Sequence, residues 1–400
     1  MLKRLKKNLK VLILLVPCIL FSLLLPSCIQ KQSETADSLG QENYSTQKKD
    51  TEKEEDPLLD YMIGQMIILG FRGTEVTASS KIVEDINTYR IGGVILFDYD
   101  MLTKSFPRNI LGPEQTKKLI KDLNKLSRSD LLITIDAEGG NVNRLNEEYG
   151  FEKIKSAQEM GSDDPENTFL EAKKLASQLD SLGININLAP VVDVDINKDN
   201  PIIGRLGRSF SQDPGEVHRH AAAFIEGMRE YNIAAAVKHF PGHGSSEEDS
   251  HLKLPDITAT YQKEAELFPY KMLIENNKAD IIMTAHIINR DIDPVYPATL
   301  SQVFLEDILR DELNYEGVII SDDMQMGAIT DNYGFDEAII KAINAGCDLI
   351  LLSNNGTEYD QEIAKKAFYA IKSAIEEGTL AEERITESYS RINKLKENLS

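Results

Sequence analysis

Eight short apolar runs, separated by longer segments of helical period, constrain the fold of this chain more than any other feature. The runs are Gln65–Phe71, Gly93–Phe97, Leu131–Asp136, Ile184–Ala189, Ala234–His239, Asp280–Ala285, Gly317–Ser321 and Asp348–Leu352. Most of them are apolar throughout, as is typical of strands that are covered on both faces of a parallel sheet. The fourth run fits this pattern least well because Asn185 and Asn187 interrupt it.

The segments between the runs have the length and period of amphipathic helices. Examples are Pro165–Leu182, Pro214–Tyr231, Tyr261–Asn276 and Phe335–Ala345. Strands and helices that alternate in this way predict a single-domain (β/α)8 TIM barrel over residues 58–400. An open, doubly wound parallel sheet is the alternative, because a strand count from one sequence can be wrong by one or two. We find no internal repeat and expect no second domain.

The first 27 residues have the features of an export signal. Five basic residues within the first ten precede an apolar run over residues 11–25. Pro17 interrupts this run, which is also shorter than the roughly 20 residues of a spanning helix, so an uncleaved transmembrane anchor is disfavoured. The sequence Leu25-Pro26-Ser27-Cys28 resembles the bacterial lipobox. We therefore expect lipidation at Cys28 and an exported protein that is anchored to a membrane, at the cell surface or on a periplasmic face.

Residues 28–57 comprise the predicted lipidated cysteine and a linker rich in Gln, Lys, Ser, Glu and Asp, a composition that buries too little apolar surface to fold. Removal of the first 27 residues leaves 39 Lys and Arg against 65 Asp and Glu, a net charge near −26. Nucleic acid is therefore not an expected partner. Cys347 is the one cysteine that falls within the predicted barrel, where we expect it to pack in the core without a disulfide.

Polar side chains gather at the carboxyl ends of the predicted strands, where barrel enzymes have their active sites. They are Asp136, Glu138 and Arg144 after the third strand, Asp193 after the fourth, Lys238, His239, His243 and His251 at and beyond the fifth, His286 after the sixth, and Asp322 and Asp323 after the seventh. Acidic, basic and imidazole groups at one mouth predict an active site. A buried strand that ends in Asp322 costs free energy unless this carboxylate is paired or used, so Asp322 is the first candidate for a catalytic carboxylate.

Four motifs carry a resemblance to a known family. They are Lys238-His239-Phe240-Pro241-Gly242-His243-Gly244 with Asp249-Ser250-His251 and Pro255; Asp136-Ala137-Glu138-Gly139-Gly140 with Val142 and Arg144; Gly207-Arg208-Ser209-Phe210; and Ser321-Asp322-Asp323-Met324. Together they resemble the motifs of glycoside hydrolase family 3, and in particular its single-domain β-N-acetylglucosaminidases of the peptidoglycan-recycling type. The resemblance covers essentially the whole chain from Leu58 onward.

The resemblance implies an exo-acting, retaining enzyme that removes terminal β-linked N-acetylglucosamine from cell-wall muropeptides or chitooligosaccharides without a cofactor. It implies that Asp322 is the nucleophile, which forms a covalent glycosyl-enzyme. It also implies that His251, oriented by Asp249, is the acid/base. Glu138 is the next candidate for that step. Asp323 is expected to pack on the opposite face, because side chains alternate along a strand.

The same resemblance implies which side chains bind the terminal sugar. They are Asp136, Arg144, Arg208, Lys238 and His239, with Arg205 as an alternative to Arg208. Lys238 and Arg208 are expected beside the nucleophile. The run from Gly242 to Ser246 predicts a mobile loop that closes over the substrate.

Other functions remain open from the residues alone. His243, Asp249 and His251 could ligate a metal, although no second metal motif accompanies them. A sugar-binding surface lipoprotein without catalysis is a second class. Within the enzymes, a β-N-acetylglucosaminide phosphorylase is the main alternative, because a neutral histidine acid/base admits anionic phosphate where a carboxylate would repel it. A family 3 β-glucosidase is a third.

Overall fold

The computed structural model describes residues 56–399. The predicted signal peptide, the lipidation site at Cys28 and the linker up to residue 55 lie outside the described residues. Helix α1 (Pro57–Gln65) begins the folded part, and the carboxylate of Asp56 accepts the amide hydrogens of Leu58 and Leu59 as its N-cap. This helix therefore starts one residue before the predicted boundary at Leu58. No helix within residues 56–399 is long and apolar enough to cross a membrane.

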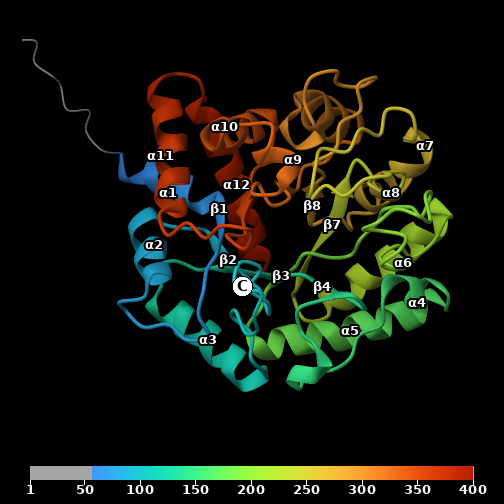
Figure 1. Ribbon diagram of the computed structural model, residues 1–400, viewed down its shortest axis with the longest axis horizontal. Helices are drawn as coiled ribbons and strands as arrows, with labels where there is room; N and C mark the ends of the chain where they lie inside the picture. Colours follow the sequence, from blue (N-terminus) through green and yellow to red (C-terminus); the bar gives the residue numbers. More distant parts are fainter. Residues whose placement is uncertain (1–55, 400) are drawn as a thin grey trace, which may run out of the picture. The chain divides into compact units, whose positions relative to one another are not determined.

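Eight parallel strands form the centre of the fold (Figure 1). They are β1 (Ile67–Gly70), β2 (Gly93–Leu96), β3 (Leu132–Ile135), β6 (Ile186–Asn187), β7 (Ala234–Phe240), β8 (Ile281–Thr284), β9 (Val318–Ile320) and β10 (Ile350–Leu352). Hydrogen-bonded neighbours run in the order β10-β1-β2-β3-β6-β7-β8-β9. A parallel bridge between Ile320 of β9 and Leu349, the residue before β10, joins the two ends of this order. The predicted (β/α)8 barrel is therefore confirmed, and the alternative of an open sheet is wrong.

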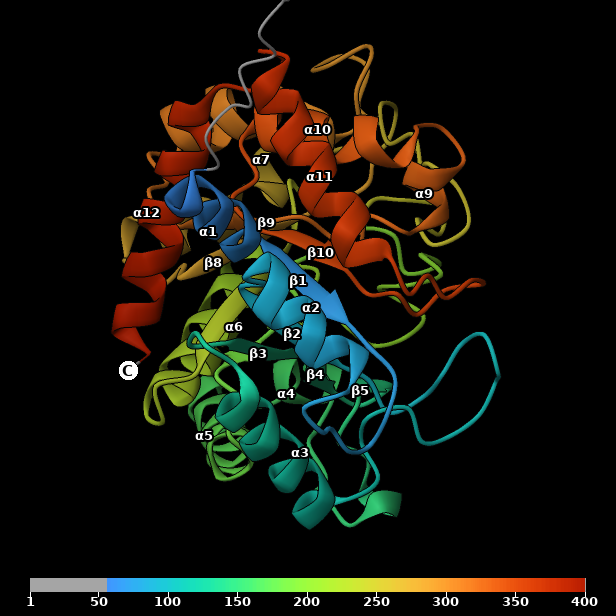
Figure 2. The same ribbon diagram turned by 90° about the vertical axis from the view of Figure 1, so that its left-hand side faces the viewer.

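Helices surround the strands in both views (Figures 1 and 2). The longer ones are α2 (Lys81–Tyr89), α3 (Pro113–Leu126), α5 (Pro165–Leu182), α6 (Pro214–Arg229), α8 (Phe268–Glu275), the π-helix Val303–Glu312, α10 (Phe335–Ala345), α11 (Ile363–Glu376) and α12 (Glu382–Asn398); short ones are α4 (Ala157–Gly161), α7 (Lys263–Glu266) and α9 (Gly327–Thr330). Asp164 and Asp213 cap α5 and α6, and a proline follows each cap. This Asp-Pro signal is why the sequence located both helix starts correctly.

The predicted helix over residues 261–276 is divided into α7 and α8 at Leu267. Pro269 lies in the first turn of α8, where its missing amide hydrogen costs least. A proline in the interior of a longer helix would remove a hydrogen bond and clash with the preceding turn. The division follows from this residue.

The short strand β6 is explained by the two asparagines that interrupt the fourth apolar run. The side-chain amide of Asn185 accepts from the Ile133 amide and donates to the Leu131 carbonyl. Asn187 bonds both backbone groups of Ala137 in the same way. These side chains therefore replace some of the backbone hydrogen bonds between β3 and β6, and β6 remains the fourth strand of the barrel.

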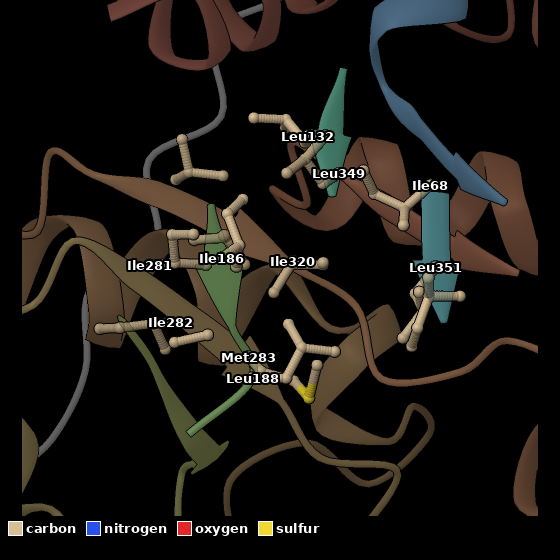
Figure 3. Packing of buried hydrophobic residues seen from close by; sticks show 14 of the residues in the cluster. Ile68, Leu132, Ile186, Leu188, Ile281, Ile282, Met283, Ile320, Leu349 and Leu351 are labelled. Carbon is tan, nitrogen blue, oxygen red and sulfur yellow. The ribbon is translucent and has the colours of Figure 1, made fainter. Parts of the chain in front are cut away.

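The core consists mainly of isoleucine, leucine and valine from the strands and the inner faces of the helices. Figure 3 shows this packing for Ile68, Ile186 and Ile282, which come from three different strands. Every residue of β1, β2 and β3 is buried, as the continuous apolar runs predicted. Cys347 is buried among these side chains, and burial raises the pKa of its thiol.

A small antiparallel hairpin at the end of β3 was not predicted. It pairs β4 (Ala137–Gly139) with β5 (Val142–Asn143). Gly139 has a positive φ of 90°, and a Cβ there would lie 2.1 Å from the carbonyl oxygen of Lys155, so only glycine fits. The hairpin carries Glu138 and leads directly to Arg144, which brings both side chains to the mouth of the barrel.

Candidate active site

Four charged side chains form a buried ion-pair network at the ends of β3 and β7. The guanidinium of Arg208 donates to both carboxylate oxygens of Glu138, at 2.8 and 2.7 Å. Nζ of Lys238 lies 2.7 Å from Oε1 of Glu138 and 2.8 Å from Oδ1 of Asp136. Burial alone raises the pKa of Glu138, but the charges of Arg208 and Lys238 outweigh it and hold that pKa far below its usual range. Glu138 is therefore ionised and holds no proton to give, which argues against it as an acid/base.

Arg208 and Arg205 are separated by their environments. Arg208 is buried in the ion-pair network, and its Nη2 lies 3.3 Å from Nε2 of His239. Arg205 is 63% exposed and pairs with Asp199, which is 86% exposed. Of the two arginines that the sequence left open, Arg208 is the one that reaches the other candidate sugar-binding residues.

Arg144 lies on the other side of Asp136. Its Nη2 is 3.8 Å from Oδ2 of Asp136, and its guanidinium lies over the ring of Phe97 at 5.4 Å from the centroid. The nearby Asp98 was not predicted as a site residue. Its Oδ1 is buried without a hydrogen-bond partner in the described part of the chain, and burial raises its pKa against the opposing charge of Arg144. Asp98 follows β2 as Asp136 follows β3, so the same strand-end pattern could have found it.

Asp193, which follows β6, organises the histidines at the end of β7. Its Oδ2 lies 2.7 Å from Nδ1 of His239, and its Oδ1 accepts the amide hydrogens of His239 at 3.2 Å and His243 at 2.8 Å. Burial raises the pKa of Asp193, but the interactions with His239 and His243 outweigh burial and lower it. Asp193 is thus an ionised support that fixes the ring of His239 against Arg208.

Lys238 and His239 are consecutive, yet both reach the site. Side chains of a regular strand alternate between faces. The pairing of β7 with β8 shifts its register between Val237 and Phe240, and such irregularities turn a side chain to a new direction. This local irregularity explains how two neighbouring residues contribute to one mouth.

Asp322 lies two residues after the end of β9 and is partly buried. Its Oδ1 accepts the amide hydrogen of Asp323 at 2.7 Å. Burial raises the pKa of Asp322, but interactions with the imidazoles of His286, His239 and His251 outweigh burial and lower it. Asp322 is therefore a carboxylate at neutral pH. The sequence predicted Lys238 and Arg208 beside this residue. In the structure those cations pair with Asp136 and Glu138, and the groups that lower the pKa of Asp322 are imidazoles.

The neighbouring Asp323 points to the seam between β9 and β10. Its carboxylate accepts hydrogen bonds from the hydroxyl and the amide of Ser353. Its backbone carbonyl lies 3.0 Å from Nε2 of His286, whose Nδ1 is 2.8 Å from Oγ1 of Thr299. Asp323 thus packs away from Asp322 and holds His286 in place.

Asp249 and His251 form a pair on the loop after β7. Nδ1 of His251 lies 2.8 Å from Oδ1 of Asp249, and the same oxygen accepts the His251 amide hydrogen at 2.8 Å. The His251 side chain is 60% exposed, unlike the other imidazoles near Asp322. One ring nitrogen is held by a carboxylate and the ring is open to ligands. Within residues 56–399, no group of three or more His, Cys, Asp or Glu side chains is arranged to hold a metal ion.

The run from Gly242 to Ser246, predicted as a mobile loop that closes over the substrate, is packed into the fold in this structure, and its closure stays a prediction. All five residues are buried. The carbonyl of His243 accepts from Asn200, and the carbonyls of Gly244 and Ser246 accept from Asn197. The exposed part of this loop begins only at Glu247.

Comparison with known proteins places the chain in a family. Residues 58–395 match the family model of the glycosyl hydrolase family 3 N-terminal domain. A β-hexosaminidase of Idiomarina loihiensis is 37% identical over 296 residues, which cover 72% of this chain and 84% of that protein. The structure of a family 3 β-N-acetylglucosaminidase from a Paenibacillus species has 36% identity and a TM-score of 0.77, covering 85% of this chain and 62% of that one. This chain therefore spans less than two thirds of the Paenibacillus protein. A β-N-acetylhexosaminidase from Beutenbergia cavernae has 27% identity and a TM-score of 0.75, covering 85% of this chain and 98% of that one.

Proposed function

Because the chain belongs to glycosyl hydrolase family 3, we propose that this glycoside hydrolase is an exo-acting, retaining β-N-acetylglucosaminidase. The observation that carries the proposal is that an ionised Asp322 and the hydrogen-bonded Asp249–His251 pair lie at the same mouth of the barrel. His251 lies close enough to lower the pKa of Asp322. A nucleophile and an acid/base at one mouth are what a retaining glycosidase needs.

The first step transfers the sugar to the enzyme. The Asp322 carboxylate attacks the anomeric carbon while the bond to the leaving oxygen breaks, and the imidazolium of His251 gives its proton to that oxygen. Asp249 holds Nδ1 of the ring, so Nε2 faces the leaving group. In the second step the neutral His251 takes a proton from water, the water oxygen attacks the anomeric carbon, and the Asp322 carboxylate is released.

Sugar recognition is assigned to the ion-pair network and its neighbours. We infer that Asp136, Arg144, Arg208, Lys238 and His239 hydrogen-bond the hydroxyl and acetamido groups of the terminal sugar. Buried polar groups reject sugars that leave them unpaired. A substrate from cell-wall muropeptides is proposed on the family resemblance, with chitooligosaccharides as a chemically similar source.

Export and anchoring are a separate proposal. The basic start, the apolar run and the sequence before Cys28 support a lipoprotein held at a membrane. The Cys28→Ala protein should be released from membranes or stay unprocessed. Normal processing with an unmodified Cys28 in mass spectra would remove this proposal.

The function is tested on purified protein with chromogenic β-N-acetylglucosaminide and β-glucoside, each with and without phosphate. We expect hydrolysis of the former without a phosphate requirement. Phosphate-dependent release of sugar 1-phosphate would support a phosphorylase, which a histidine acid/base also permits, and preference for the glucoside would support a β-glucosidase. Binding without turnover of either substrate would support a sugar-binding protein.

The nucleophile is tested by substitution and by trapping. Asp322→Asn should abolish turnover and leave the fold intact, because a neutral amide does not attack the anomeric carbon. A 5-fluoro glycoside should label a peptide that contains Asp322 in the wild-type protein. Labelling of a peptide without Asp322 would show that another residue is the nucleophile.

A further inference from the structure

The residues around the acid/base histidine form a tight turn that is attached to the barrel at two places. We call residues 249–253 the dyad turn. The amides of Leu252 and Lys253 both donate to the carbonyl of Asp249, which closes the turn on itself. Leu252 is 73% exposed, so the turn stands at the surface of the mouth. One attachment holds the side chain of Ser250 and the other holds the carbonyls of Ser250 and His251; they come from the loop after β7 and from α9.

The first attachment comes from the loop that follows β7. Nε2 of His243 lies 3.2 Å from Oγ of Ser250, and both residues are buried, with 1% and 2% exposure. His243 is itself fixed, because its amide donates to Asp193 and its carbonyl accepts from Asn200. Burial lowers the pKa of His243 to about 4. At neutral pH this ring is therefore an uncharged hydrogen-bonding group, and it anchors the residue directly before His251.

The second attachment comes from the segment that follows the nucleophile. The amide of Gly327 donates to the carbonyl of His251 at 3.2 Å, and the amide of Ala328 donates to the carbonyl of Ser250 at 3.3 Å. Both donors lie in the first turn of α9, a few residues after Asp322 (Figure 2). A Cβ on Gly327 would lie 2.9 Å from the His251 carbonyl oxygen. The backbone of the nucleophile segment thus contacts the acid/base turn at a distance that only glycine allows.

We propose that His243, Ser250 and Gly327 are positioning residues that set the location of His251 relative to Asp322. The inference rests on the proposed roles of Asp322 and His251. These three residues do not touch the reacting atoms. They act by joining the acid/base turn to the buried start of the β7 loop and to the nucleophile segment, and these contacts set the separation of the two catalytic groups. Small displacements of reacting groups are costly, since about 1 Å of misplacement can lower a rate about 10²-fold.

The hydrogen bond between His243 and Ser250 is tested with two substrates. Ser250→Ala should lower kcat/KM about 3- to 10-fold on a natural β-linked disaccharide, the range of one lost hydrogen bond. An activated nitrophenyl glycoside needs little protonation, so its kcat/KM should stay within about 2-fold. Ser245→Ala is the matched control, because Ser245 is equally buried in the same loop and its hydroxyl makes no hydrogen bond to the dyad turn in the described structure. It should leave both substrates unchanged.

Two further variants show whether the loss of activity in Ser250→Ala comes from the hydrogen bond between His243 and Ser250. His243→Leu should lower disaccharide kcat/KM as Ser250→Ala does. His243→Gln should keep most of the wild-type value, because an amide nitrogen can reach the Ser250 hydroxyl. Since the two residues act through one contact, the double variant His243→Leu/Ser250→Ala should lose no more than the larger single loss. Additive losses, or equal losses on both substrates, would overturn the assignment of His243 and Ser250.

The contact from α9 has its own test. Gly327→Ala should push the dyad turn outward and lower disaccharide kcat/KM about 10- to 100-fold, again with a smaller effect on the nitrophenyl glycoside. Gly334→Ala is the control, because the nearest atom to its added Cβ lies 4.0 Å away. Near wild-type disaccharide activity in Gly327→Ala would overturn its positioning role. If the wild-type protein hydrolysed both substrates and every variant kept the wild-type ratio of the two kcat/KM values, the positioning roles would be wrong and the proposed function would stand. An inactive wild-type protein would instead reject the proposed function.

Discussion

At the scale of single residues, the environment of each carboxylate indicates which chemical role it can take. Glu138 touches Arg208 and Lys238 and is held as a permanent anion. Asp322 is an anion influenced by imidazoles, and no lysine or arginine among residues 56–399 lies within hydrogen-bonding distance of it. A carboxylate that is already saturated by two cations is a poor nucleophile and a poor acid. One that faces imidazoles is free to bond to carbon.

His251 is expected to matter most when the leaving group is poor. His251→Ala should lower disaccharide hydrolysis by about 10²- to 10⁴-fold, the usual contribution of general acid catalysis, and affect a nitrophenyl glycoside much less. Asp249→Asn should give a weaker form of the same pattern, because it releases the ring without deleting it. Burst kinetics should accompany the rates, since slow deglycosylation affects both substrates. Disaccharide hydrolysis near the wild-type rate would show that the acid/base lies elsewhere.

Glu138→Gln is expected to behave differently from His251→Ala. Loss of the charge leaves Arg208 and Lys238 buried with less compensation, and breaking a buried pair typically costs about 3–5 kcal/mol of stability. Because we propose that Arg208 and Lys238 bind the sugar and not the leaving group, kcat/KM should fall by the same factor on disaccharide and nitrophenyl glycoside. Urea unfolding measures the loss of stability, and kcat/KM on the two substrates measures the loss of activity. A loss confined to the disaccharide would return Glu138 to consideration as the acid.

At the scale of elements, the sequence predicted strand ends better than the segments between them. The barrel and the strand-end location of Asp136, Lys238 and Asp322 follow from apolar runs that a buried parallel sheet requires. The hairpin β4–β5 has no periodic signal, because its conformation depends on positive φ at Gly139 and Gly140 and on contacts with residues distant in sequence. The contacts of the dyad turn could not be predicted from the sequence either, since Gly327 and His251 are far apart in the chain and meet only in the folded protein.

The short helix α7 carries a buried acid behind the loop of β7. Oε2 of Glu266 accepts the Ser245 amide hydrogen at 3.3 Å, and Gly242 packs against the same side chain. Burial raises the pKa of Glu266 to about 7, from an ordinary 4.5. The folded protein therefore keeps this proton up to about pH 7, whereas the unfolded chain releases it near its ordinary value.

Stability should consequently fall as pH rises between these two values, because the folded state binds more protons there. The difference corresponds to about 3 kcal/mol, at about 1.4 kcal/mol per pH unit. Glu266→Gln stays uncharged and should lack this decline. Urea unfolding of both proteins at pH 5 and pH 8 measures the contrast, and parallel pH dependence would show that Glu266 ionises freely in the folded protein.

At the scale of the whole molecule, the carboxyl ends of the strands carry the candidate active site, and the amino ends carry contacts that stabilise the barrel. The barrel closes between β9 and β10, where an isolated bridge pairs Ile320 with Leu349. At the amino end of this seam, the fully buried Asp348 accepts from the Ile319 amide and from Arg310, Arg384 and Arg391. These arginines belong to the π-helix before β9 and to α12, so one carboxylate ties the last helix to the closing strands. In a barrel, such contacts at the amino end serve stability.

Asp348→Asn should therefore lower stability without changing the chemistry. Removing the charge leaves three arginines around a neutral amide, and breaking a buried ionic contact typically costs about 3–5 kcal/mol. For a domain of this size that corresponds to a Tm lower by about 4 to 7 °C. At 25 °C, kcat and KM on the chromogenic substrate should match the wild type, because the mouth is untouched.

The matched control is Asp360→Asn, which breaks a partly exposed pair with Lys366 at 2.6 Å. Exposed pairs are worth about 0–1 kcal/mol, so this Tm should hardly move. Calorimetry and initial rates on the three proteins separate the two ends of the barrel. Equal Tm values for the Asp348 and Asp360 variants would show that the seam does not depend on this carboxylate. A fall in kcat for Asp348→Asn at unchanged Tm would show that the amino end of the barrel influences the mouth.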